Sequence, residues 1–162
     1  MIVCIVAVER NQGIGFNGSM PWPRLGDDMR WFADTTRHNV VVMGSTTWKS
    51  IGKSLSDRIN VVISSTLHAD AQHTYDDPEE AITDLAKRYS NKNIYIIGGQ
   101  KVYDATKHLV EKFQVTEIDA NYECDRFFDL DYVKQKYKQV EEMFTIEATD
   151  TEPKYTIKEY TR

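Results

Sequence analysis

Two adjacent carboxylates, Asp27 and Asp28, stand at the start of a predicted helix over Asp28–Thr36 and are the first candidates for chemistry. Acids in a first helical turn often cap the helix and compensate its dipole. Neighbouring helical residues point about 100° apart, so the two acids need not share a role. Asp28 shares a face with Met29 and Phe32, where an unpaired carboxylate is costly without a ligand or partner. Capping and ligand binding both remain open for Asp28.

A glycine pair, Gly98-Gly99, follows the apolar run Ile94–Ile97 and precedes a helix candidate over Lys101–His108. Glycines at such a junction let a phosphate approach the backbone N–H groups that begin a helix. The pair could equally be a tight turn, and the segment lacks the G-x-G-x-x-G pattern of a Rossmann nucleotide site. It therefore indicates either a phosphate site or a turn.

The other reactive residue types show weaker patterns. Arg58 precedes the apolar run Ile59–Ile63, where its guanidinium could be solvated or could bind a carboxylate. Tryptophans are more often core residues than cofactor platforms, which applies to Trp22, Trp31 and Trp48. The four histidines have no metal-ligand spacing, and no G-x-S-x-G motif or cysteine nucleophile context occurs. We assign no metal site.

The elements that must position these residues follow from short apolar runs. Runs rich in Val and Ile predict strands buried on both faces, as in parallel sheets, at Ile2–Val8, Val40–Met43, Ile59–Ile63 and Ile94–Ile97. Helices are predicted between them at Asp28–Thr36, at Thr46–Ile51, from the Asp77-Pro78 start and at Lys101–His108. Alternating strands and helices predict right-handed βαβ units.

The C-terminal third predicts strands at Phe113–Asn121, Tyr137–Ile146 and Tyr155–Tyr160, at least one of them antiparallel at the edge of a mixed sheet. The segment Glu9–Arg24 predicts a long loop, and structureless loops of that length are usually functional. The start of the chain, MIVCIVAV, indicates a buried strand rather than a signal peptide.

Composition narrows the class of protein. The 162 residues carry 20 Lys+Arg and 25 Asp+Glu, a net charge of −5, and fit a single domain over residues 1–162. This acidic balance argues against nucleic acid or an anionic membrane as the main partner. No apolar stretch approaches the roughly 18 residues of a spanning helix. Cys4 and Cys124 indicate free thiols in a reducing, cytoplasmic setting.

The order of these signals resembles the dihydrofolate reductase family over essentially the whole chain. The motifs that carry the resemblance are Ile5-Val6-Ala7, Gly13-Ile14-Gly15, Met20-Pro21-Trp22-Pro23, Asp28-Met29-Arg30-Trp31-Phe32, Val42-Met43-Gly44, Thr47-Trp48, Ser50-Ile51-Gly52, Arg58-Ile59-Asn60-Val61-Val62, Ile96-Ile97-Gly98-Gly99, Val102-Tyr103 and Thr116-Glu117-Ile118-Asp119. The resemblance implies a single α/β domain. Its central sheet would be mostly parallel, with about eight strands, about four flanking helices and a C-terminal antiparallel edge strand.

The resemblance implies NADPH-dependent reduction of 7,8-dihydrofolate to 5,6,7,8-tetrahydrofolate, which supplies one-carbon metabolism and thymidylate synthesis. Hydride would add to C6 of the pterin and a proton to N5. The catalytic set it implies is Asp28, Trp22, Thr116 and Met20. Asp28 is chosen over Asp27 because it stands three residues before Trp31-Phe32. It would meet the 2-amino and N3 edge of the pterin, with Thr116 supporting it. A water admitted by the Met20 loop would protonate N5.

The resemblance also implies the binding residues. The apolar slot for the pterin and benzoyl groups would comprise Ile5, Val6, Met29, Phe32, Ile51 and Leu55, and Arg58 would bind the glutamate-tail carboxylate. The cofactor would lie against Ala7, Ile14, Gly15, Gly44, Ser45, Thr46, Thr47, Ser64, Ser65, Thr66, Ile97, Gly98, Gly99, Lys101, Val102 and Tyr103. Antifolates such as methotrexate or trimethoprim would compete with dihydrofolate, and a monomer is expected.

Three departures from the family pattern carry expectations of their own. Ser45 stands where the family often carries Arg near the cofactor 2′-phosphate, so NADPH should be preferred over NADH by a smaller margin. Cys124 replaces a common glycine in the loop, with Asp125, that would brace the Gly13–Pro23 lid. Ser54-Leu55-Ser56 replaces a Pro-rich stretch, which predicts a looser wall beside the glutamate tail.

Two alternatives remain from the sequence. One is a reductase of a flavin-precursor pyrimidine on the same fold, which would need neither Asp28 with Thr116 nor Arg58. The other is a non-catalytic binding or structural protein that keeps the fold.

Overall fold

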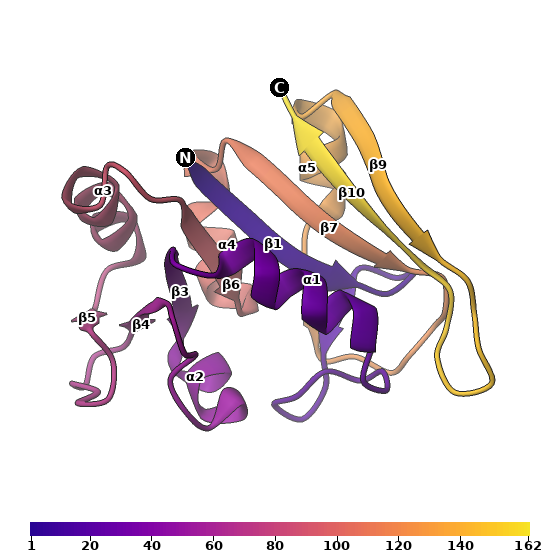
Figure 1. Cartoon of the computed structure of the whole chain (residues 1–162), viewed down its shortest axis with the longest axis horizontal. Coiled ribbons are helices and arrows are strands. Elements are labelled where there is room, and N and C mark those ends of the chain that lie inside the picture. Colours follow the sequence, from indigo (N-terminus) through magenta and orange to yellow (C-terminus); the bar gives the residue numbers. More distant parts are fainter.

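An eight-stranded sheet in the order β5-β4-β3-β6-β1-β7-β10-β9 forms the centre of the computed structural model, which describes residues 1–162 (Figure 1). Its strands are β1 (Ile2–Val8), β3 (Val40–Gly44), β4 (Ile59–Ile63), β5 (His73–Tyr75), β6 (Ile94–Gly98), β7 (Lys112–Ile118), β9 (Gln139–Ile146) and β10 (Tyr155–Thr161). From β5 to β7 all neighbours pair in parallel, whereas β10 is antiparallel to both β7 and β9. A separate two-stranded ribbon joins β2 (Gly13–Gly15) to β8 (Arg126–Phe127).

Helices cover both faces of the sheet because its central strands are apolar on both sides. The helices are α1 (Gly26–Thr36), α2 (Ser45–Ile51), α3 (Pro78–Arg88), α4 (Gln100–Thr106) and α5 (Leu130–Lys136), with a 3₁₀ turn at Lys107–Leu109. Val40 and Val42 pack with residues of α3, α4 and α5 in one core cluster. Val41 and Met43 pack on the opposite face with residues of α1 and α2. The alternation of side chains along each strand produces this three-layer arrangement.

The expected mixed, mostly parallel α/β fold is confirmed, as are its four predicted helices. The Asp77-Pro78 start behaves as its sequence indicated, because the Asp77 side chain accepts the Glu79 N–H and Pro78 is the first helical residue. Helix α5 was not predicted, although Asp129 caps it and Leu130 and Val133 carry its buried face. Strand β5 escaped prediction because its three residues lack an apolar pattern.

Two expectations about the strands need correction. The C-terminal strand β10 is antiparallel but is not itself the edge strand, which is β9. Burial gives the reason: Tyr155 and Ile157 of β10 are almost fully buried, whereas seven of the eight residues of β9 are exposed. The Glu9–Arg24 segment is also not structureless, since it contains β2. None of the helices is long and apolar enough to cross a membrane.

Candidate active site

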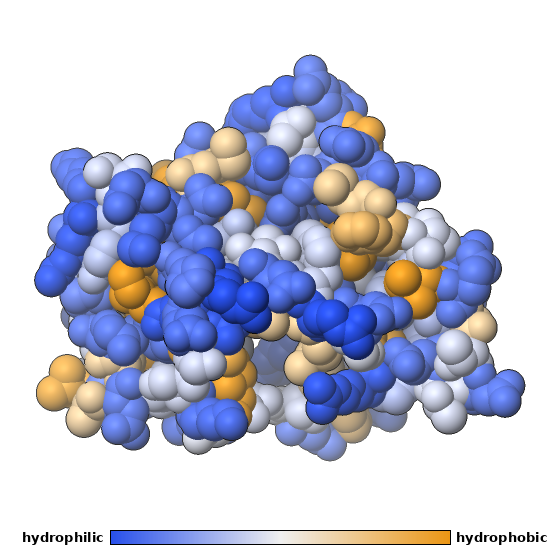
Figure 2. All heavy atoms as spheres, in the orientation of Figure 1, coloured by the Kyte–Doolittle hydropathy of each residue, from blue (hydrophilic) through white to orange (hydrophobic).

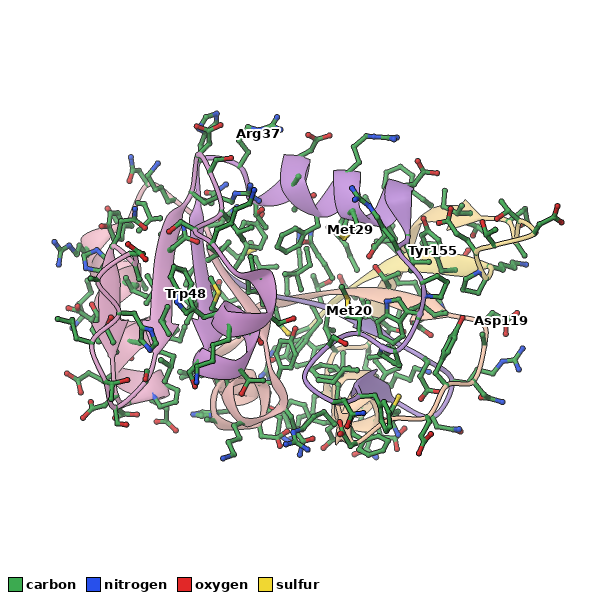
Figure 3. All side chains as sticks on the ribbon, turned by 90° about the horizontal axis from the view of Figure 1, so that it is seen from below. Met20, Met29, Arg37, Trp48, Asp119 and Tyr155 are labelled. Atoms are coloured by element: carbon green, nitrogen blue, oxygen red, sulfur yellow. The ribbon has the colours of Figure 1, made fainter.

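The carboxyl ends of the parallel strands meet at one edge of the sheet, at the lower side of Figure 1, beside α2 and the Glu9–Arg24 loop. In open α/β sheets this edge is where ligands bind. Figure 2 shows a hollow there, below α1 and flanked by apolar side chains. Figure 3 looks at the same edge, with Met29 on α1, Met20 on the loop and Trp48 on α2. The candidate site lies among these three segments.

Asp28 of α1 and Thr116 of β7 form the polar centre of this site. The Thr116 hydroxyl donates to Asp28 Oδ1 at 2.6 Å. Thr116 is buried and Asp28 is half-buried, and burial raises the pKa of the Asp28 carboxyl while the bond from Thr116 partly opposes that rise. Asp27 instead pairs with Arg30 at 2.9 Å on the exposed face of the helix. The structure therefore separates the two acids, and Asp28 is the one held in the site.

The start of α1 is held by side chains from the far end of the chain. Leu25 at the N-cap position supplies no side-chain hydrogen bond. The Tyr155 hydroxyl accepts the Asp28 N–H at 3.2 Å, and Glu152 Oε1 accepts the Gly26 N–H at 3.3 Å. Tyr155 is 1% exposed and packs with Leu25 and Trp22. Tyr155 and Glu152, which the sequence analysis missed, therefore set the position of Asp28. The contact between Tyr155 and Asp28 spans 127 residues, and no local spacing in the sequence indicates it.

The apolar slot comes from both sides of this edge. Phe32, Ile51 and Leu55 pack around a cluster that contains buried Ile5. Met29 is 40% exposed at the rim of the site. The expectation that Val6 lines the slot is wrong for its side chain, which packs in the core on the opposite face of the sheet. Only the backbone of Val6 can face the slot. Adjacent residues of a strand point to opposite faces, so Ile5 and Val6 cannot both line one slot with their side chains.

Arg58 lies beyond the slot in a fixed orientation. Its Nη1 donates to Thr36 Oγ1 at 3.1 Å and its Nε donates to the Ser56 carbonyl at 2.9 Å. Burial and the neighbouring Arg37 lower the pKa of the Arg58 guanidinium, and Asp57 opposes that shift. No carboxylate of the chain forms a salt bridge with Arg58. The guanidinium of Arg58 can therefore donate hydrogen bonds to an external carboxylate.

Two strand-to-helix junctions meet at the glycines predicted for the cofactor. A Cβ on Gly44 would lie 3.2 Å from Val102 Cγ2, and one on Gly98 would lie 3.3 Å from Thr47 Oγ1. Gly98 has φ +130°, a conformation that side-chain-bearing residues rarely adopt, and its peptide bond to Gly99 is cis. Neither α2 nor α4 has a side-chain N-cap. The junctions thus offer backbone N–H groups in a cradle that side chains would fill, which fits a pyrophosphate.

The other cofactor candidates fall into two groups. Buried or partly buried residues packed into the cores beside this cradle are Ala7, Ile14, Ile97, Val102 and Tyr103. The Tyr103 hydroxyl donates to the Ile5 carbonyl at 2.8 Å, so it joins the end of β6 to β1. Polar or accessible residues around the edge are Gly15, Ser45, Thr46, Ser64, Ser65, Thr66 and Lys101. Ser64, Ser65 and Thr66 line a separate cavity of about 360 Å³.

The Glu9–Arg24 loop is fastened at its base by a buried carboxylate that the sequence analysis missed. Glu9 is 3% exposed, and its Oε1 accepts the N–H groups of Asn11 and Gly13, both at 2.8 Å. Its Oε2 accepts the Tyr122 N–H at 3.2 Å, which ties the loop to the segment that follows β7. An isolated Glu after a strand gives no signal of this role, because its three partners are backbone groups.

The expected bracing segment does contact the loop. Asp125 accepts the Asn17 N–H at 3.1 Å and donates its own N–H to the Gly15 carbonyl at 2.8 Å. Cys124 packs against Gly13, where a Cβ would overlap its sulfur. Burial and nearby Glu9 raise the pKa of the Cys124 thiol. Within the loop, Trp22 is 7% exposed and anchored near Tyr122, whereas Met20 is 56% exposed. The loop thus has fixed ends and an exposed tip.

The chain is similar to known proteins of one family. The family model for dihydrofolate reductase matches residues 1–162. The dihydrofolate reductase of Bos taurus is 36% identical over 153 residues, covering 82% of this chain and 81% of that protein. The enzyme of Rattus norvegicus is 34% identical with the same coverage, and a viral dihydrofolate reductase of Saimiriine herpesvirus 2 is 38% identical over 79% of this chain and 68% of its own length. The chain belongs to the dihydrofolate reductase family and is an oxidoreductase of that class.

Proposed function

We propose that this enzyme reduces 7,8-dihydrofolate to 5,6,7,8-tetrahydrofolate with NADPH as the hydride donor. The observation that carries the proposal is the Asp28–Thr116 pair beside an apolar slot. A half-buried carboxylate held at 2.6 Å by a buried hydroxyl is suited to bind a flat ring through its N–H donors. The pyrophosphate cradle at Gly44, Gly98 and Gly99 supports a dinucleotide as the second ligand.

Asp28 serves to bind and orient the pterin rather than to protonate N5 directly. Its Oδ1 accepts from Thr116, which leaves Oδ2 to accept from the 2-amino and N3 edge of the ring. N5 lies on the far side of the pterin ring, so a water reaching it past Met20 is the proposed proton source. The exposed tip of the loop supports such access, because Met20 is 56% exposed while the base is fastened at Glu9.

Orientation and water exclusion account for most of the proposed catalysis. Ile5, Phe32 and Leu55 exclude water from the slot, which strengthens the interactions of Asp28 with the ring. The reduced nicotinamide, when bound, supplies the hydride that adds to C6. The residues proposed to hold that cofactor are the glycines of the cradle and Thr47, with Ala7 and Ile14 at the nicotinamide end.

Arg58 is proposed to bind the glutamate-tail carboxylate. Its guanidinium is oriented by Thr36 and Ser56 and has no carboxylate partner in the chain. This argues against the flavin-precursor pyrimidine as substrate, because that ligand has no such tail. We expect antifolates such as methotrexate to compete for the same slot. We also propose that residues 1–162 act as one domain and as a cytoplasmic monomer.

The experiment is a turnover assay that follows loss of reduced-nicotinamide absorbance with dihydrofolate and NADPH, run beside the same assay with a flavin-precursor pyrimidine. Turnover with dihydrofolate alone would support the proposal. Turnover with the pyrimidine alone would favour the other reductase, and no turnover with either would favour a non-catalytic protein. Asp28→Asn is the matched control, since it removes the charge and preserves the shape of the side chain.

A further inference from the structure

The path of a dinucleotide along the sheet edge follows from the strand order, and this argument rests on the proposed function. Five parallel strands present their carboxyl ends side by side in the order β1, β6, β3, β4, β5. Neighbouring strands lie about 4.8 Å apart. A dinucleotide with its reactive ring at the end of β1 and its phosphates at the β6 and β3 glycines must place its adenosine over the ends of β4 and β5.

A cavity of about 360 Å³ occupies that last place. It lies where β4 and β5 end together, since the Ser64 N–H donates to the Tyr75 carbonyl at 2.7 Å. Its walls include the hydroxyls of Ser64, Ser65 and Thr66 and the carboxylates of Asp76 and Glu80. No Lys, Arg or His lines it. The cavity thus combines hydroxyl groups and negative charge.

Cationic side chains do not balance the charge of these two carboxylates. Neither Asp76 nor Glu80 forms a salt bridge. The N-terminus of α3, which is a local source of positive potential, already carries the Asp77 cap and has Glu79 and Glu80 in its first turn. Ser45, the first residue of α2 directly after β3, is also neutral.

We propose that Asp76, assisted by Glu80, determines cofactor specificity by favouring a ribose with a free 2′-hydroxyl over one with a 2′-phosphate. A carboxylate at the adenosine end of a dinucleotide site can accept a hydrogen bond from a ribose hydroxyl, whereas cationic side chains accommodate the phosphate. Two unit charges about 4 Å apart in water change a dissociation constant roughly fivefold. A carboxylate that faces the 2′-phosphate, which carries nearly two negative charges, therefore weakens binding of the phosphorylated cofactor by on the order of tenfold. The enzyme therefore uses NADH with an efficiency within about tenfold of that with NADPH.

The test measures binding and turnover separately in the full-length enzyme. Dissociation constants for NADP⁺ and NAD⁺ come from tryptophan fluorescence, and kcat/KM is measured with NADPH and NADH. The variants are Asp76→Asn and Asp76→Lys, with Asp150→Asn as a control that removes an exposed carboxylate from the β9–β10 connection. We expect Asp76→Asn to shift the ratio of dissociation constants toward NADP⁺ by about tenfold, Asp76→Lys by about a hundredfold, and Asp150→Asn not at all.

The outcomes distinguish this inference from the proposed function. A wild-type preference for NADP⁺ above about tenfold, or a ratio that neither Asp76 variant changes, overturns the inference and leaves dihydrofolate reduction standing. Failure of both dinucleotides to bind overturns the proposed function and the inference with it. A wild-type ratio near unity that rises in both Asp76 variants supports the role of Asp76.

Discussion

Replacing Asp28 with Asn should nearly abolish dihydrofolate turnover while leaving the protein folded. Thr116 occupies one acceptor site of Oδ1, so the carboxylate has free lone pairs for two bonds to the pterin edge. Charge-assisted bonds contribute about 1.5–3 kcal/mol each, so losing two of them costs about 3–6 kcal/mol. That loss corresponds to roughly two to four decades in kcat/KM. Residual activity should rise as pH falls, because dihydrofolate that is already protonated bypasses part of the missing function.

The same Asp28→Asn substitution that lowers activity should leave the stability of the folded protein unchanged or raise it. Because burial raises the pKa of the Asp28 carboxyl, the folded protein binds a proton here more readily than the unfolded chain. This contribution to stability is fully present below the unfolded pKa and is lost as pH rises through the raised folded pKa. The ionised form of Asp28 is therefore less favourable in the folded protein than in the unfolded chain, whereas Asn is neutral and its carbonyl can still accept from Thr116. We expect a Tm at neutral pH equal to or above that of the wild type.

The assay is steady-state kinetics over a range of pH, with thermal unfolding measured on the same samples. Asp27→Asn is the control, because Asp27 is exposed and pairs only with Arg30. If Asp27→Asn were crippling and Asp28→Asn harmless, the assignment of the carboxylate would be wrong by one residue. A large fall in Tm for Asp28→Asn would show that the carboxylate stabilises the fold and would refute the reasoning on burial.

Three further predictions concern tail binding, cofactor choice and helix position. Arg58→Leu should weaken binding of glutamate-bearing folates by about one to two decades and leave a tail-less pterin unaffected, as titration of both ligands would show; equal losses would make Arg58 structural. Ser45→Arg should widen the NADPH over NADH ratio of kcat/KM roughly tenfold, and an unchanged ratio would mean that position 45 does not face the 2′-phosphate. Tyr155→Phe leaves the Asp28 N–H without its acceptor, so the free energy of unfolding measured with denaturant should fall by about 1–2 kcal/mol, and kcat/KM should fall as well. An unaltered kcat/KM would show that this hydrogen bond does not position Asp28.

Features that depend on near neighbours in the chain could be predicted from the sequence. The apolar runs Ile2–Val8 and Ile59–Ile63 became strands with the predicted bounds, because residues buried on both faces leave a continuous hydrophobic signature. The start of α3 at Asp77-Pro78 could also be predicted, because a capping side chain and the N–H group that it accepts lie within one turn. The ordered motifs were sufficient to indicate the family, and the family model matches the whole chain.

The tertiary structure decided which side chains meet. From sequence alone Asp28 could be a cap or a ligand, and the answer depends on Thr116 and Tyr155, which come from strands 88 and 127 residues away. The role of Glu9 depends on backbone groups of two loops, and the environment of Asp76 on the place of β5 at the end of the sheet. Local sequence sets where a strand begins and ends, but strand order and register, which arise from packing of the whole core, determine which distant side chains share a site.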